Sequence, residues 1–131
     1  MEGNSHISIS HDYTASSEAI YSMIAEGKLF KLTGADEITF DFSENGPFEL
    51  KFTGRGRIHG QILKLIPNEK VVLQWDVDGF DMDLERDTKV WITILHTQGH
   101  TTVTIEHREI PTEESAAAKK KAWPEILNEL T

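Results

Sequence analysis

The last third of the chain constrains the fold most strongly, because a strand-like segment there leads into a single terminal helix. Apolar and polar residues alternate from Thr101 to His107, which is the period of a half-buried β-strand. After Ile110-Pro111, apolar residues recur every three or four positions, which predicts a helix capped by Thr112. A helix that follows a series of hairpins can bury its apolar face only against the sheet. We therefore expect a curved sheet around a C-terminal helix, with room for a cavity between them.

The rest of the chain predicts antiparallel strands separated by tight turns, and one further helix. Short alternating segments are bounded by Gly, Pro and Asn, which gives about six or seven strands in an α+β fold. After the first strand, Thr14 is expected to cap a helix that carries Ile20, Tyr21 and Ile24 on one face and ends at Gly27 or Gly34. The alternating segments lie around residues 7–9, 38–42, 48–52, 58–66, 71–77, 80–85, 89–96 and 101–107, and about six or seven of them are expected to form strands.

Length and composition exclude several classes of protein. A chain of 131 residues has room for one domain, which we expect to span residues 1–131. The 22 acidic and 13 basic residues give a formal net charge of −9, which argues against nucleic acid as a partner. No apolar segment approaches the roughly 20 residues of a membrane-spanning helix, and the first residues do not resemble a secretory signal. Cysteine is absent, so we expect a cytoplasmic protein without disulfides or cysteine-bound metal.

Four parts of the chain carry a family resemblance, namely residues 14–21, residues 60–67 leading to Trp75, residues 107–111, and Trp123-Pro124 with Leu127 and Leu130. Together they resemble the family of the activator of Hsp90 ATPase, within the Bet v 1-like or START-like (SRPBCC) superfamily. The similarity to its Aha1-type C-terminal domain covers nearly the whole chain. It implies a helix-grip fold with an apolar cavity between the sheet and the last helix. In place of the paired tryptophan of many members, this sequence has Phe30-Lys31-Leu32-Thr33.

Aromatic residues and one histidine are the candidates for the cavity wall. By alternation His107 shares a face with Val103 and Ile105, which makes it either a hydrogen-bonded core residue or a polar contact for a ligand. Gly60 is expected to deepen the cavity because it has no side chain. The candidate ligand-binding residues are Phe40, Phe42, Trp75, Trp91, His107, Trp123 and Leu127, with Trp75, Trp123 and His107 favoured.

We expect no catalytic residues, metal site or cofactor. The six histidines lack the spacing of a helical metal site. The acidic segment 76–87 does not have the glycine position of an EF-hand and is expected to lie on a solvated face, as is Lys119-Lys120-Lys121.

Three functional hypotheses remain open. The first is a module that binds a small hydrophobic molecule in the cavity, and the second is an interaction with an Hsp90-type chaperone through the outer face of the sheet. The third is an enzyme of the cyclase or hydrolase type, with His107 paired with Glu106 or Glu109. Strand alternation argues against that pair, because Glu106 is out of phase with His107 and Glu109 lies beyond the expected strand. The sequence predicts neither the oligomeric state nor the identity of a ligand.

Overall fold

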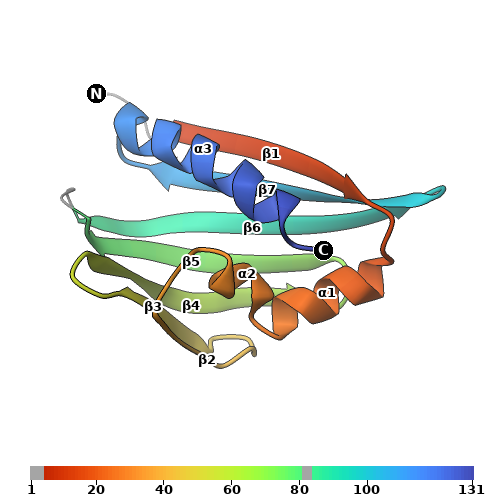
Figure 1. Cartoon of the computed structure of the whole chain (residues 1–131), viewed down its shortest axis with the longest axis horizontal. Helices are drawn as coiled ribbons and strands as arrows, with labels where there is room; N and C mark the ends of the chain where they lie inside the picture. The colour runs from red at the N-terminus through yellow and green to blue at the C-terminus, as the bar shows by residue number, and fades with distance from the viewer. Residues whose placement is uncertain (1–4, 81–83) are drawn as a thin grey trace.

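The computed structural model describes residues 5–80 and 84–131, which form one curved antiparallel sheet and three helices (Figure 1). The seven strands are arranged in the order β1-β7-β6-β5-β4-β3-β2, which confirms the predicted α+β helix-grip fold. In the part of the chain that the structure describes, no helix is long and apolar enough to cross a membrane. The elements in chain order are β1 Ser5–Tyr13, α1 Ser17–Ala25, α2 Lys28–Lys31, β2 Glu37–Phe40, β3 Pro47–Phe52, β4 Gly56–Ile66, β5 Lys70–Gly79, β6 Glu85–Thr97, β7 His100–Ile110 and α3 Glu113–Asn128.

The strand expected over residues 80–85 lies partly outside the described residues. Phe80 is in a turn after β5, and Glu85 is the first residue of β6. Residues 81–83 are not described.

Pairing of the first strand with the last one sets the position of the C-terminal helix. In β1 and β7, Ile9 lies opposite Ile105 and Tyr13 lies opposite Thr101. Helix α3 starts directly after β7 and runs over these two strands on the concave face of the sheet (Figure 1). The Tyr13 hydroxyl donates a 2.5 Å hydrogen bond to the carbonyl oxygen of Leu127, which ties the end of α3 to the end of β1.

The start and the buried face of α3 are as the sequence predicts. The Thr112 hydroxyl accepts a hydrogen bond from the backbone N–H of Ser115 at 3.0 Å, which satisfies one of the unpaired donors at the helix N-terminus. Glu113 and Glu114 occupy the first turn, where the helix dipole favours negative charge. The helix continues through Pro124 to Asn128. Its buried apolar residues, together with Leu130 just beyond it, are Ala116, Trp123 and Leu127.

The N-terminal helical segment differs from the prediction. The cap of α1 is Ser16 instead of Thr14, because Thr14 lies in a bend directly after β1 and the Ser16 hydroxyl is the group that accepts from Ala19 N–H. Helix α1 ends at Ala25, and Gly27 in the left-handed region (φ 89°) turns the chain into the short helix α2, which the sequence did not predict. Phe30 of α2 stacks on Phe48 of β3 with ring centroids 5.0 Å apart.

Gly60 serves a different purpose from the one expected. A Cβ atom on Gly60 would lie 1.9 Å from the backbone oxygen of Gln74 on β5. Glycine is therefore needed for the close approach of β4 and β5, and its contribution is to the sheet and not to the cavity.

Candidate functional site

A pocket lies between α3 and the β3–β5 part of the sheet, where the helix does not reach across. Its volume is about 400 Å³. Ala118 and Ala122 face it from α3, and their small side chains leave space that longer ones would fill. Ile126 continues this helical face one turn further along. The lining residues are Thr33, Phe52, Arg55, Ile58, Trp75, Val77, Phe80, Ala118, Lys119, Ala122, Trp123 and Ile126.

Two buried tryptophans from different elements meet beside the pocket. Trp75 of β5 and Trp123 of α3 have ring centroids 5.2 Å apart and planes tilted by 54°. Strand alternation points Trp75 toward the concave face, and the buried face of the helix points Trp123 toward the same place. The sequence predicted both as cavity residues, and both line the pocket.

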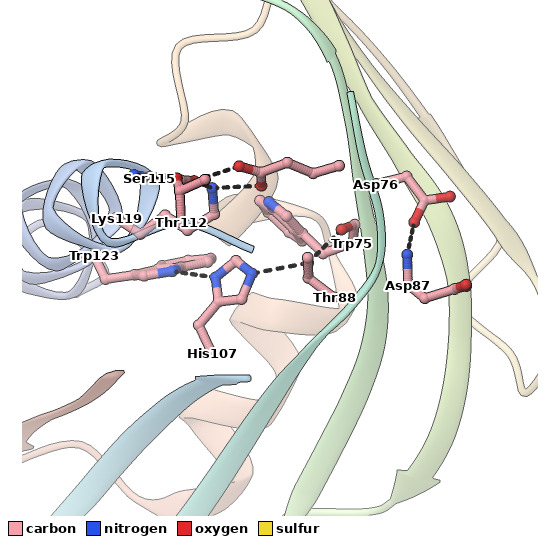
Figure 2. A network of polar contacts seen from close by, with 10 residues as sticks. Trp75, Asp76, Asp87, Thr88, His107, Thr112, Ser115, Lys119 and Trp123 are labelled. Atoms are coloured by element: carbon pink, nitrogen blue, oxygen red, sulfur yellow. Dashed lines mark hydrogen bonds and ion pairs between the residues drawn. The ribbon is translucent and has the colours of Figure 1, made fainter. Parts of the chain in front are cut away.

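His107 lies behind the tryptophans and is fully buried, with a hydrogen-bond partner on each ring nitrogen (Figure 2). The Trp123 indole N–H donates to Nδ1 at 3.1 Å, and Thr88 Oγ1 lies 3.0 Å from Nε2. Indole nitrogen can only donate, so Nδ1 must be the acceptor. The Thr88 hydroxyl donates to the carbonyl oxygen of Trp75, so Nε2 must carry the proton. His107 is therefore a neutral Nε2–H imidazole that links the Trp123 indole, through the Thr88 hydroxyl, to the backbone of Trp75, and it is not among the residues that line the pocket.

Burial keeps His107 neutral. Removal from water disfavours the imidazolium, and the positive charge of Lys119 adds to this, so that the pKa of His107 falls from 6.5 to about 3. Of the two interpretations given by the sequence, the hydrogen-bonded core residue is the one that the geometry supports.

Glu85, Ser115 and Lys119 form a second, charged cluster at the start of α3 (Figure 2). Lys119 Nζ lies 2.9 Å from Glu85 Oε1 and 2.7 Å from Ser115 Oγ, and the Ser115 hydroxyl donates to the other Glu85 oxygen. The side chains of Glu85 and Lys119 are only 2% and 13% exposed. The expectation that both would lie on solvated faces is wrong, because the ion pair links the first residue of β6 to the second turn of the helix.

Asp76 is a second exception to the expected solvated acidic face. The β5–β6 register shifts between Trp75 and Val77, which leaves Asp87 N–H without a strand partner. The buried Asp76 carboxylate accepts this N–H at 2.7 Å, on the far side of the strand from the pocket (Figure 2). Asp81 and Asp83 lie outside the described residues. In residues 5–80 and 84–131, no group of three or more histidine or acidic side chains is arranged to hold a metal ion.

The other four candidate residues lie away from the pocket. Trp91 is on the outer face of the sheet, where Arg108 and Lys70 lie over its ring at 4.4 and 5.4 Å. Phe40 and Phe42 pack edge-to-face against Phe30 of α2 and Tyr21 of α1. Leu127 belongs to the last turn of α3, where its side chain is fully buried and its carbonyl oxygen is bonded to Tyr13. Val90, Ile92 and Ile94 alternate along β6 and are buried, so strand alternation places Trp91 on the outer face of the sheet.

Several pocket residues were not among the sequence candidates. Arg55 lies in the turn between β3 and β4, and Lys119 was expected on a solvated face. Phe52 lies in the expected strand 48–52 and also lines the pocket. Ala118 and Ala122 are four residues apart and therefore on one face of the helix, which was the available signal. Alanine contributes little to the apolar periodicity by which a buried helix face is found.

The architecture defines the chain as a helix-grip fold, with a pocket between its C-terminal helix and the sheet. Residues 14–131 match the family described as Activator of Hsp90 ATPase homolog 1-like protein. The chain belongs to this family, as the resemblance in its sequence indicated. A comparison with curated proteins gave no match.

Solved structures with the same fold come from several organisms. The Aha1 dimer from Colwellia psychrerythraea has a TM-score of 0.77 and 23% identity, over 96% of this chain and 92% of that one. CalU16 from Micromonospora echinospora has a TM-score of 0.73 and 19% identity, over 94% and 71%. An HSP90 activator from Plasmodium falciparum has a TM-score of 0.69 and 20% identity, over 90% and 86%. At these identities the likeness establishes the fold alone.

Proposed function

We propose that this protein binds a small apolar molecule in the pocket between α3 and the sheet. The observation that carries the proposal is the pocket itself, whose volume of about 400 Å³ lies within the roughly 300–1,000 Å³ of small-molecule sites. Among the described residues that line it, five are aliphatic, two are tryptophan, two are phenylalanine and three are polar or charged, so nine of the twelve are apolar.

The walls of the pocket suit an occupant with an apolar, preferably aromatic, body. Ala118 and Ala122 are exposed on α3, and an occupant would cover them along with the edges of Trp75 and Trp123. Each Å² of apolar surface removed from water contributes about 25 cal/mol, and tilted aromatic pairs add to this. The His107 ring accepts a hydrogen bond from the Trp123 indole and lies edge-on to the Trp75 ring with centroids 6.0 Å apart, which keeps the rings in one arrangement before a ligand arrives.

Binding can be tested with N-phenylnaphthylamine, a neutral apolar dye whose fluorescence rises when it leaves water. We expect saturable binding, a higher melting temperature and a change in tryptophan emission. Ala122→Phe should fill the pocket and abolish all three changes. Ala117→Phe is the matched control, because Ala117 is exposed on α3 but does not line the pocket. Equal binding by both variants, or no binding by the unaltered protein, would contradict the proposal.

A second candidate is an interaction with an Hsp90-type chaperone, which membership of the family favours. The outer face of the sheet offers Trp91 covered by Arg108 and Lys70. Pull-down with Hsp90 and stimulation of its ATPase at low salt test this function directly. We expect Trp91→Ala to reduce both signals and Ala122→Phe to leave them unchanged. Absence of both signals with the unaltered protein would exclude the candidate.

The geometry gives no support to an enzyme that uses His107 as an acid or base. Both ring nitrogens are engaged, and the Glu106 carboxylate is on the opposite face of β7, where it binds Arg108 at 2.5 Å. A catalytic imidazole needs a free nitrogen within reach of its substrate.

A further inference from the structure

The charges of the pocket differ in sign from the charge of the whole chain. The protein has 22 acidic and 13 basic residues, yet the charged residues among the described residues that line the pocket are Arg55 and Lys119. Within residues 5–80 and 84–131, no acidic residue lines the pocket. An apolar ligand with a negatively charged group would therefore meet two cations at this site.

Arg55 is held at the pocket by aromatic rings. Its guanidinium carbon lies 5.4 Å from the ring centroid of Phe80 and 5.9 Å from that of Phe52, and both rings line the pocket. The backbone N–H of Phe80 donates to the Arg55 carbonyl oxygen at 2.7 Å. Phe80 has φ 61°, which is unfavourable for a bulky residue. The chain thus adopts a strained conformation that keeps this ring against the arginine.

The Arg55 guanidinium retains its capacity to bind an anion. It is exposed and forms no ion pair with any residue in the described parts of the chain. Its charge lowers the pKa of Asp36, but the Asp36 carboxylate is already bonded to the backbone N–H of Thr53 at 2.6 Å, which is the larger cause of that shift. A guanidinium over an aromatic ring keeps its planar fork of N–H donors, which matches a carboxylate or sulfonate. Lys119 contributes less, because Glu85 already neutralises it.

The opposite end of the pocket has the reverse charge. A second hollow of about 410 Å³ shares Thr33, Ala122 and Ile126 with the pocket and is also lined by Glu125 and Glu129. The C-terminus of α3, with its negative dipole end, is at this hollow. A charged head would be attracted to Arg55 and repelled from the end of the helix, which defines the direction in which a ligand lies.

From these observations we propose that the pocket selects amphipathic organic anions, with the apolar body over Trp75 and Trp123 and a carboxylate-like head at Arg55. This inference rests on the proposed binding function and adds the class and orientation of the ligand. Apolar carboxylic acids are the chemical class that it predicts.

Two dyes that differ only in charge test the inference. Anilinonaphthalene sulfonate has the aromatic body of N-phenylnaphthylamine and an added sulfonate. We expect the unaltered protein to bind the sulfonate dye more tightly than the neutral one. Arg55→Met should weaken the sulfonate dye about tenfold, as expected for one charged hydrogen-bonding group, and change the neutral dye less than about twofold. Decanoate should displace the sulfonate dye from the unaltered protein more effectively than decanol.

Arg57→Met is the matched control for the change in net charge. Arg57 is two residues away and paired with Glu49 and Asp78 on the outer face, so neither dye should respond to its loss by more than about twofold. Binding of the neutral dye together with an unchanged sulfonate affinity in Arg55→Met would overturn the inference and leave the proposed function in place. Failure of the unaltered protein to bind either dye would overturn both.

Discussion

Glu85 and Lys119, which are 34 residues apart in the chain, form an ion pair with an N–O distance of 2.9 Å and are almost entirely shielded from water. The pair joins the first residue of β6 to α3, and the Ser115 hydroxyl bridges it. A shielded pair of this kind is costly to break from one side, because the remaining charge is left without its partner.

We therefore expect Glu85→Gln to lower the free energy of unfolding by about 3 kcal/mol, as measured by urea denaturation. Glu49→Gln is the control, because Glu49 pairs with Arg57 at a similar distance on the exposed outer face and should cost less than about 1 kcal/mol. Adding Lys119→Met to Glu85→Gln should recover part of the loss. Equal losses of unfolding free energy in Glu85→Gln and Glu49→Gln would contradict a larger contribution from the shielded ion pair.

The neutral state of His107 makes stability depend on pH. The unfolded chain takes up a proton on this residue below pH 6.5, whereas the folded protein does so only below about pH 3. The unfolded state binds more protons in this window, so the stabilisation is complete above pH 6.5 and is lost as the pH falls toward 3. The loss is at most roughly 5 kcal/mol.

His107→Gln isolates this contribution, because glutamine does not titrate and can both accept from Trp123 and donate to Thr88. Unfolding free energies of the two proteins should converge as the pH falls from 6.5 toward 3. A constant difference across the window would show that His107 is not kept neutral by folding.

Tyr13→Phe should loosen the end of α3. The variant removes only the hydroxyl that donates to the Leu127 carbonyl, so we expect a loss of about 1–2 kcal/mol and faster amide hydrogen exchange in the last turn of the helix. Tyr21→Phe, on α1, is the control and should change stability by less than about 0.5 kcal/mol. Unchanged amide hydrogen exchange in the last turn would argue against a stabilising hydrogen bond between Tyr13 of β1 and Leu127 of α3.

Gly60→Ala should destabilise the sheet by about 3 kcal/mol or more, because the added carbon would overlap the backbone oxygen of Gln74. Gly99→Ala has open space around its Cβ position and a left-handed φ of 82°, so it should cost only about 1 kcal/mol. Thermal unfolding of both variants gives the comparison. A smaller effect at Gly60 than at Gly99 would contradict the close approach of the two strands.

Local patterns in the sequence predicted the regular elements well. Alternation placed Trp75 on the concave face, and the hydroxyl of Thr112 with the acids after it marked the start of α3. The resemblance of the sequence led to the correct family. Helix α2 was missed because a single turn of four residues is too short to show a helical period.

Residue spacing alone specifies which faces of the strands and of the last helix are apolar. The tertiary structure decided which polar groups are buried together, such as Glu85 with Lys119 and His107 with Trp123. It also decided that Arg55 lies at the pocket, because that position depends on how a turn folds against Phe80. Contacts of this kind join distant parts of the chain, and no local pattern specifies them.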